Sequence, residues 1–108
     1  MHNLPHEECW AVYLNRQNRV LHKECISKGG IHSTVMDPKI IIKKGIEKLA
    51  TGIILYHNHP SGSPYPGKED IRQTKLLKEA SSLMEISLID HIIIAGEKFY
   101  SFSENSGM

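Results

Sequence analysis

The chain has 108 residues with 13 basic and 12 acidic side chains, a formal net charge of +1, so its overall charge does not favour nucleic acid or an anionic membrane as partner. Hydrophobic residues make up 40% and charged residues 23%, a balance typical of one globular domain spanning residues 1–108. The apolar runs are far shorter than the ~18 residues a transmembrane helix needs, and no leader is recognisable, so we expect a cytoplasmic protein.

The first third of the sequence predicts a β-hairpin. Strand-forming residues dominate Glu8 to Leu14, and after four turn-forming residues the segment Arg19 to Ser27 carries a second set of apolar side chains. Lys28-Gly29-Gly30 ends the hairpin, and a short extended piece is expected over Ile31 to Val35.

A helix and a buried strand are predicted next. Asp37 is expected as the N-cap, with Pro38 at the first helical position. Apolar residues then recur to Ala50 at spacings of three and four, which predicts one packed face: Ile41, Ile42, Gly45, Ile46 and Leu49. The continuously apolar run Ile53 to Tyr56 predicts a central strand that is covered on both faces.

After a loop rich in proline and glycine, a second helix is expected from about Lys68 to Met84. Its stripe is expected to contain Ile71, Gln73, Leu76, Leu77, Ala80, Leu83 and Met84. Strands are expected over Ser87 to Ala95 and Lys98 to Ser103. This order predicts a layered mixed sheet with helices on its faces, and an exposed last strand could pair with a copy of itself in a homodimer.

Two histidines and an aspartate stand out in the string HNHPSGSPYPGKED, which runs from His57 to Asp70 directly after the apolar strand. Side chains alternate along a strand, so His57 and His59 can present both imidazoles to one point. Zinc binds imidazole nitrogens and carboxylate oxygens, and a catalytic zinc keeps three protein ligands. Asp70, in the first turn of the second helix, is the natural third ligand, so the string predicts a zinc site.

Each of these residues also has a structural interpretation. His57 and His59 can be hydrogen-bonded histidines at a strand end, and Asp70 can be a carboxylate that suits the dipole at a helix start. The complete string, with its proline after the histidines and its stiff loop before the aspartate, favours ligation. A catalytic metal also needs a general acid/base, and the residues alone leave Glu7 and Glu8 open as candidates.

Several strings resemble the RadC family within the JAMM (MPN-type) zinc metallopeptidases: HNHPSG at His57 to Gly62, the P-x-P that follows, EDIRQT at Glu69 to Thr74 and LIDHIII at Leu88 to Ile94. The resemblance covers nearly the whole chain. It implies a three-layer α/β/α sandwich with a mixed sheet, of the cytidine-deaminase-like type, an α+β fold that agrees with the element order. Full-length members carry a helix-hairpin-helix region ahead of this domain, and we expect residues 1–108 to be the domain without that region.

The same resemblance implies one Zn²⁺ per chain, held by His57, His59 and Asp70. The family pattern of a glutamate, one residue and an aromatic fits Glu8-Cys9-Trp10, so the resemblance implies Glu8 as the general acid/base, with Glu7 out of step. The serine of the family's S-x-x-D motif, similar to an oxyanion-stabilising donor in related peptidases, is replaced by Gly67. That departure weakens the case for peptidase activity more than the case for zinc binding.

Four further residues are candidates for supporting roles. Ser61 or Ser63 can replace the missing hydroxyl if the loop places it at the site. Asp90 and His91 have two interpretations: Asp90 bonds a neighbouring backbone group or histidine while His91 lies at a sheet edge, or the pair supports a zinc-bound imidazole. Specificity is expected in residues 61–66 and 28–35.

Two functions of different class follow from these residues. The first is a zinc-dependent hydrolase, a JAMM-type metallopeptidase or isopeptidase acting on a protein or peptide, which Glu8 favours. The second is a non-catalytic metal-binding module that interacts with protein or DNA, in a family traditionally labelled DNA repair, which Gly67 favours. The letters HNH do not indicate an HNH nuclease, whose residues are spread over tens of positions, and the sequence has no H-x-E with P-C-x-x-C of a zinc deaminase.

Overall fold

A computed structural model describes residues 4–28 and 36–105 of the chain. The extended piece expected over residues 31–35, and most of the specificity segment 28–35, lie outside the described residues. In chain order the elements are β1 (Glu8–Leu14), β2 (Val20–Lys28), α1 (Pro38–Glu47), β3 (Gly52–Asn58), α2 (Lys68–Leu83), β4 (Ser87–Ala95), β5 (Lys98–Ser101) and α3 (Phe102–Asn105).

The strands form one mixed five-stranded sheet in the order β2-β1-β3-β4-β5, which confirms the predicted hairpin and the α+β class. β3 and β4 are parallel and are joined through α2, while the other neighbouring strands are antiparallel. β3 is therefore the central strand. β5 is an edge strand as predicted, but it ends at Ser101 because the Ser101 hydroxyl accepts from the Glu104 backbone N–H and caps α3.

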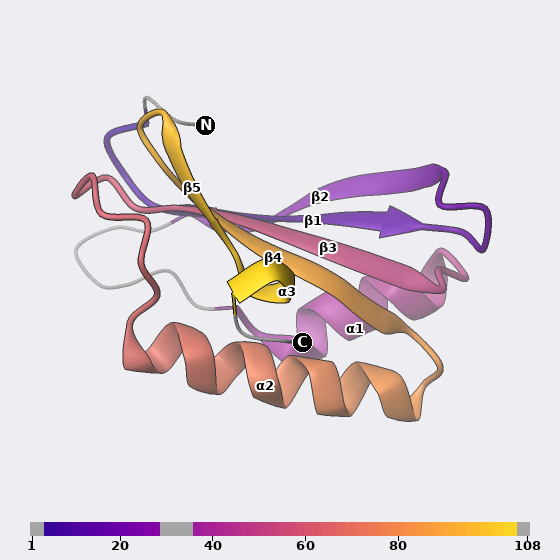
Figure 1. Cartoon of the computed structure of the whole chain (residues 1–108). Helices are drawn as coiled ribbons and strands as arrows, with labels where there is room; N and C mark the ends of the chain where they lie inside the picture. Colours follow the sequence, from indigo (N-terminus) through magenta and orange to yellow (C-terminus); the bar gives the residue numbers. More distant parts are fainter. Residues whose placement is uncertain (1–3, 29–35, 106–108) are drawn as a thin grey trace.

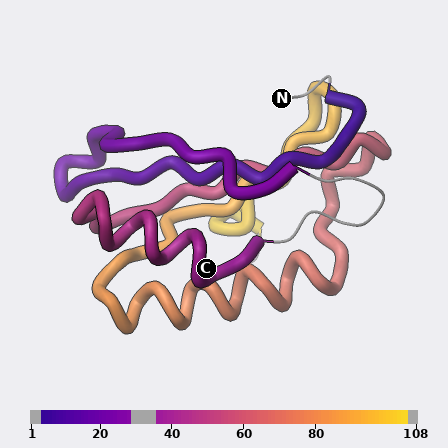
Figure 2. Tube along the Cα trace, turned by 180° about the vertical axis from the view of Figure 1, so that it is seen from behind, coloured from indigo at the N-terminus to yellow at the C-terminus, as the bar shows by residue number. Residues whose placement is uncertain are grey.

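The two long helices lie on the same face of the sheet, as Figures 1 and 2 show. The described residues thus form two layers, where the expected sandwich has three. Tyr13, Ile53 and Leu55 point into the buried layer between sheet and helices and are fully buried. Ile54 and Tyr56 alternate with them and are only half-buried, so the prediction that this strand is covered on both faces is wrong for the described part of the chain.

Helix α1 begins as predicted, because the Asp37 carboxylate accepts from the Lys39 N–H and Pro38 follows it. The helix ends at Glu47, and Leu49 has φ 53° and is 83% exposed. The predicted stripe is wrong for Ile46, which is 46% exposed, and for Leu49. Ile41 and Gly45, one turn apart, are the residues that α1 buries.

Helix α2 has nearly its predicted bounds, but its buried face differs from the predicted stripe. Leu77 is the one member of that stripe that is buried, and the other buried residues of the helix are Thr74 and Ser81. Ile71 and Leu83 are 51% and 85% exposed. Two hydroxyl residues therefore take core positions that the apolar pattern did not predict.

A bulge in β4 determines the directions of the side chains in the LIDH segment. The pairing with β3 advances from Ile53–Leu88 to Ile54–Asp90, so Ile89 is an extra residue in the ladder. Leu88 and His91 are consequently both buried, although they are three residues apart. None of the helices in the described ranges has the length and hydropathy needed to span a bilayer.

Candidate metal centre

His57 lies on β3 between two neighbouring strands. It pairs with Cys9 on β1 and Ile93 on β4, and it is 2% exposed. Both of its ring nitrogens are buried and neither makes a hydrogen bond to the described residues. A buried polar group without a partner costs on the order of 1–3 kcal/mol of folding free energy. A further ligand on a ring nitrogen of His57 would remove this cost.

His59 follows the end of β3, where its backbone N–H donates to the Ile94 carbonyl at 2.8 Å. Its Nδ1 lies 2.9 Å from the carbonyl oxygen of Ser63. Since a carbonyl can only accept, we assign the proton to Nδ1, which leaves the lone pair on Nε2. The rings of His57 and His59 have centroids 4.7 Å apart, so the prediction that they share one side is confirmed.

Asp70, the third residue of α2, brings its carboxylate to both histidines. Its Oδ1 lies 3.7 Å from His57 Nδ1 and its Oδ2 lies 3.4 Å from His59 Nε2. The Gly67 N–H donates to Oδ2 at 2.8 Å and fixes the orientation of the carboxylate. The structure therefore brings together the three residues that the sequence predicted as ligands.

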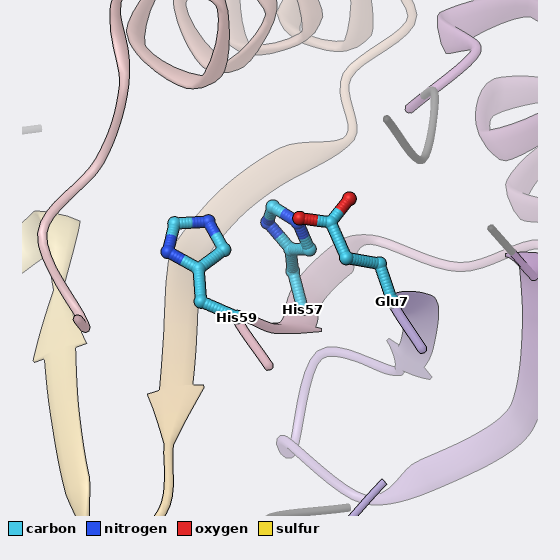
Figure 3. A group of neighbouring side chains, drawn as sticks. All are labelled: Glu7, His57 and His59. Carbon is cyan, nitrogen blue, oxygen red and sulfur yellow. The ribbon is translucent and has the colours of Figure 1, made fainter. Parts of the chain in front are cut away.

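Glu7 supplies a second carboxylate. Its Oε1 lies 3.8 Å from His57 Nε2, and Figure 3 shows its side chain directed toward that ring. Ligand atoms of Glu7, His57 and His59 all lie within 4.8 Å of one another. This arrangement of two imidazoles between two carboxylates can hold a divalent cation.

Glu8 does not lie beside the histidines, contrary to the expectation. Its carboxylate accepts from the Trp10 indole at 2.8 Å and lies 2.9 Å from His6 Nε2. It lines a groove with Trp10, Val12 and Tyr56. Side chains alternate along a strand, so Glu8 shares a face with Trp10, whereas Glu7 shares the opposite face with Cys9, the residue paired with His57.

The serine candidates are not buried at the site. Ser61 and Ser63 are both exposed, and Ser63 contributes its carbonyl oxygen to His59. Gly67 is the N-cap of α2 with φ −78°, which any residue can adopt. An added Cβ at Gly67 would meet Asp70 Oδ2 at an ordinary 3.6 Å. The position of the family serine is therefore open to a larger residue.

Asp90 has the first of its two expected roles. Its carboxylate accepts from the backbone N–H groups of His91 and Ser103 at 2.7 and 3.0 Å and from the Ser101 hydroxyl at 2.6 Å. These bonds join β4 to the start of α3.

One of the two interpretations of His91 placed it at a sheet edge, and that one is wrong, because β4 is an interior strand and His91 is 0% exposed. Its ring stacks on His57 at 5.8 Å on one side and on Phe102 at 4.7 Å on the other. Its Nδ1 lies 2.7 Å from Thr74 Oγ1. Thr74 was not among the predicted site residues, although its position one turn after Asp70 indicates that the two residues are neighbours.

The charges at the site suit a cation. Burial lowers the pKa of His57, partly opposed by the nearby Asp70 carboxylate, and burial lowers the pKa of His91 to about 3. The hydrogen bond to Asp70 raises the pKa of His59. Burial alone would raise the pKa of Asp70, but bonds from His59 and the Gly67 N–H outweigh it and hold that pKa below its usual value.

The ligand separations are compatible with a small divalent cation such as zinc. Zinc–ligand distances of ~2.0–2.2 Å in a tetrahedral site place two ligand atoms roughly 3.4 Å apart. The His59 Nε2 to Asp70 Oδ2 separation is 3.4 Å, and the separations around His57 are 3.7 and 3.8 Å. Asp70 lies beside Nδ1 of His57 and Glu7 beside Nε2, so one ion would take a single nitrogen of this ring together with His59 and a carboxylate.

Comparison with known proteins identifies the family of this chain. A family model described as the RadC-like JAB domain matches residues 1–108. The chain is 46% identical over 99 residues to a UPF0758 protein of Flavobacterium johnsoniae, a match covering 92% of this chain and 43% of that protein. It is 41% identical to UPF0758 proteins of Bacillus licheniformis and Streptococcus sanguinis, which covers 96% and 94% of this chain and 46% and 45% of theirs.

The chain thus spans less than half the length of these curated relatives. The names of these relatives describe no activity. The family match and the identity levels together settle the relationship: the chain belongs to the family of RadC-like JAB domains.

Proposed function

We propose that this domain is a zinc-dependent hydrolase of peptide or isopeptide bonds, in which His57, His59 and Asp70 hold the metal and Glu7 is the general acid/base. The observation that carries the proposal is the buried His57 imidazole, which lacks a hydrogen-bond partner among the described residues on either nitrogen and lies 3.7 and 3.8 Å from two carboxylates. A core imidazole of this kind is costly unless a partner occupies the space beside it, and a cation between the imidazole and the carboxylates is such a partner.

The chain's own residues divide the work of such a site. The Ser63 carbonyl holds the tautomer of His59 that leaves Nε2 free, and the Gly67 N–H holds the Asp70 carboxylate. A bound zinc ion would supply the Lewis acidity that makes water nucleophilic at neutral pH. Glu7 would take the proton from that water and deliver it to the leaving amine.

Glu7 suits this role because it is close to the ligands and still accessible. Its side chain is 27% exposed, whereas that of His57 is 3% exposed. A general base must reach both water and substrate, so a partly exposed carboxylate beside a buried ligand is the appropriate arrangement. The net charge of +1 gives no electrostatic reason to prefer DNA over a peptide as substrate.

A non-catalytic metal-binding module is the second candidate, and Gly67 favours it. A backbone position without a hydroxyl cannot supply the donor that the S-x-x-D serine provides. Loss of one such donor costs ~10²–10³ in turnover, which can leave a metal site without useful hydrolysis.

Metal analysis and hydrolysis assays together test the proposal. We expect about one zinc per chain in the purified protein, lost in His57→Ala and Asp70→Ala. Hydrolysis of a panel of peptide and isopeptide substrates should require zinc and be lost in Glu7→Gln. A zinc-loaded protein that cleaves none of them would support the binding module, and a protein that takes up no zinc would contradict both candidates.

A further inference from the structure

Two of the proposed zinc ligands are carried by different elements. His57 is on the central strand β3, and Asp70 is on α2, which packs on the sheet through few side chains. Productive metal geometry needs the ligands held within about 0.5 Å. Apolar packing is not directional, so it constrains the position of a carboxylate on the helix less tightly than a hydrogen bond does. A directional contact near Asp70 would fix it.

Thr74 makes that contact from the helix side. It lies one turn after Asp70, and its hydroxyl donates to the Asp70 carbonyl at 2.6 Å. The same oxygen lies 2.7 Å from Nδ1 of His91 on β4. Because the single hydroxyl proton is used on the carbonyl, the oxygen accepts from His91 Nδ1–H. This pair of bonds ties the Asp70 turn of α2 to the sheet.

His91 carries the contact to the second ligand. It pairs with Leu55 on β3, two residues before His57, and its ring stacks on the His57 ring at 24°. The Phe102 ring lies parallel on its other side, at an interplanar angle of 1°. His91 is therefore held on both faces by rings and at one edge by Thr74, and it supports the buried side of the His57 imidazole.

Stability does not explain this pair. Thr74 is 3% exposed and His91 0% exposed, and His91 Nε2 has no hydrogen-bond partner among the described residues. A valine and an aromatic residue would fill the same space without a buried unpaired polar atom, which costs on the order of 1–3 kcal/mol. A buried polar pair with this cost, touching both ligand-bearing elements, indicates a role at the site.

We propose that Thr74 and His91 are positioning residues of the metal centre, which fix Asp70 on α2 relative to His57 on β3. The inference rests on the proposed function, since it assigns these residues a role toward the zinc ligands. Neither side chain needs to touch the metal or the substrate.

The test compares zinc affinity and Co²⁺ absorption spectra across variants of the whole chain. Thr74→Val removes the hydroxyl at constant shape, and His91→Phe keeps the stacked ring without Nδ1. Each should weaken zinc binding about 10–100-fold, measured by competition with a chromophoric chelator, and should shift the Co²⁺ d–d bands. Thr74→Ser, which keeps the hydroxyl, should restore affinity to within roughly threefold of the original chain.

Ser81→Ala is the matched control. Ser81 is also on α2 and 0% exposed, but its hydroxyl bonds only to Lys78 of its own helix among the described residues. The substitution removes a buried hydroxyl from the same helix and should leave zinc affinity unchanged, which separates positioning from a general effect of altering the buried face of α2. If Thr74→Val does not fold, His91→Phe carries the same comparison.

The outcomes separate this inference from the proposed function. Zinc affinity and cobalt spectra equal to those of the original chain in a folded Thr74→Val or His91→Phe would overturn the positioning role and leave the hydrolase proposal intact. Failure of the unmodified chain to bind zinc would overturn both.

Discussion

Glu7 and Glu8 are neighbours in the chain, yet their carboxylates lie on opposite sides of the sheet. Glu7 Oε1 is 3.8 Å from His57 Nε2, while Glu8 is held by the Trp10 indole at 2.8 Å. Hydrogen bonds from Trp10 and His6 lower the pKa of Glu8 and keep it ionised on the far side of β1. The two residues therefore form a natural pair of variants that differ in position and share their chemistry.

Glu7→Gln should abolish hydrolysis, with a loss of about 10²–10⁴ in turnover, because an amide cannot accept the proton from water. Zinc content should stay near that of the original chain, since the three proposed ligands His57, His59 and Asp70 remain. Glu8→Gln is the matched control and should keep turnover within about threefold. Turnover on the most reactive peptide or isopeptide substrate, with zinc content measured in parallel, checks both. Equal losses in the two variants would contradict the assignment to Glu7.

The contrast between these glutamates also shows how far the sequence alone reaches. Two local features predicted the arrangement of the histidines and the aspartate: the i, i+2 spacing of His57 and His59, and the helix start before Asp70. In the structure the side chains of these three residues lie close together. The family resemblance implied Glu8, through the pattern of a glutamate, one residue and an aromatic, but Trp10 and Glu8 both line the groove on the face opposite the histidines. Which face of a strand is buried depends on the rest of the fold, so residues 7 and 8 could not be separated by local pattern.

The burial of His91 and the packing of Thr74 could not be predicted from local pattern for a related reason. The bulge at Ile89 changes the alternation of side chains along β4, so that the His91 side chain points into the core. The residue types in LIDH do not predict a bulge. Thr74 sits in a helix whose apolar residues predicted a different packed face. Hydroxyl groups at core positions become visible only when their partners, here a carbonyl and an imidazole, are in place.

Zinc affinity should increase with pH through the pKa of His59. Its hydrogen bond with Asp70 raises this pKa above the usual 6.5, and the imidazole must lose its proton before Nε2 can bind a metal. His57 does not compete in this range, because burial lowers its pKa. Calorimetric titrations in buffers of different ionisation enthalpy should show proton release on zinc binding that decreases toward high pH. In metal-free Asp70→Asn, an NMR titration should show the pKa of His59 shifted to lower pH.

The same pair should stabilise the metal-free protein in mild acid. A raised His59 pKa contributes stability that is present below pH 6.5 and lost as the pH rises through the folded pKa, and a lowered Asp70 pKa contributes stability that is lost as the pH falls below 3.8. Asp70→Asn should therefore cost about 1–2 kcal/mol near pH 5.5 and less at pH 9. Urea unfolding in the presence of a chelator at both pH values measures this loss of unfolding free energy. A loss that does not depend on pH would contradict the interaction between His59 and Asp70.

Gly67→Ser should be accommodated and should favour hydrolysis. The backbone already has φ −78°, and the new Cβ would meet Asp70 Oδ2 at 3.6 Å. A serine N-cap changes helix stability by only a few tenths of a kcal/mol, roughly, relative to glycine. If the missing hydroxyl limits catalysis, turnover should rise by about 10-fold or more, up to ~10². Gly67→Ala, which adds the Cβ without the hydroxyl, is the control and should lower the melting temperature without raising turnover.

Asp90→Asn should lower stability and leave the metal centre intact. Asp90 receives three hydrogen bonds, two from backbone N–H groups and one from Ser101. Burial raises the pKa of Asp90, but these hydrogen bonds outweigh that effect and hold the pKa below its usual value. Removing the charge weakens bonds that join β4 to α3, at a cost of about 1.5–3 kcal/mol. That cost should disappear as the pH falls through the Asp90 pKa, because the aspartic acid is then neutral too. Zinc affinity should stay within about threefold, since the carboxylate touches no ligand. Denaturant unfolding at pH 7 and at pH 3, with zinc affinity at pH 7, tests the assignment, and a large loss of affinity at unchanged stability would instead make Asp90 part of the metal site.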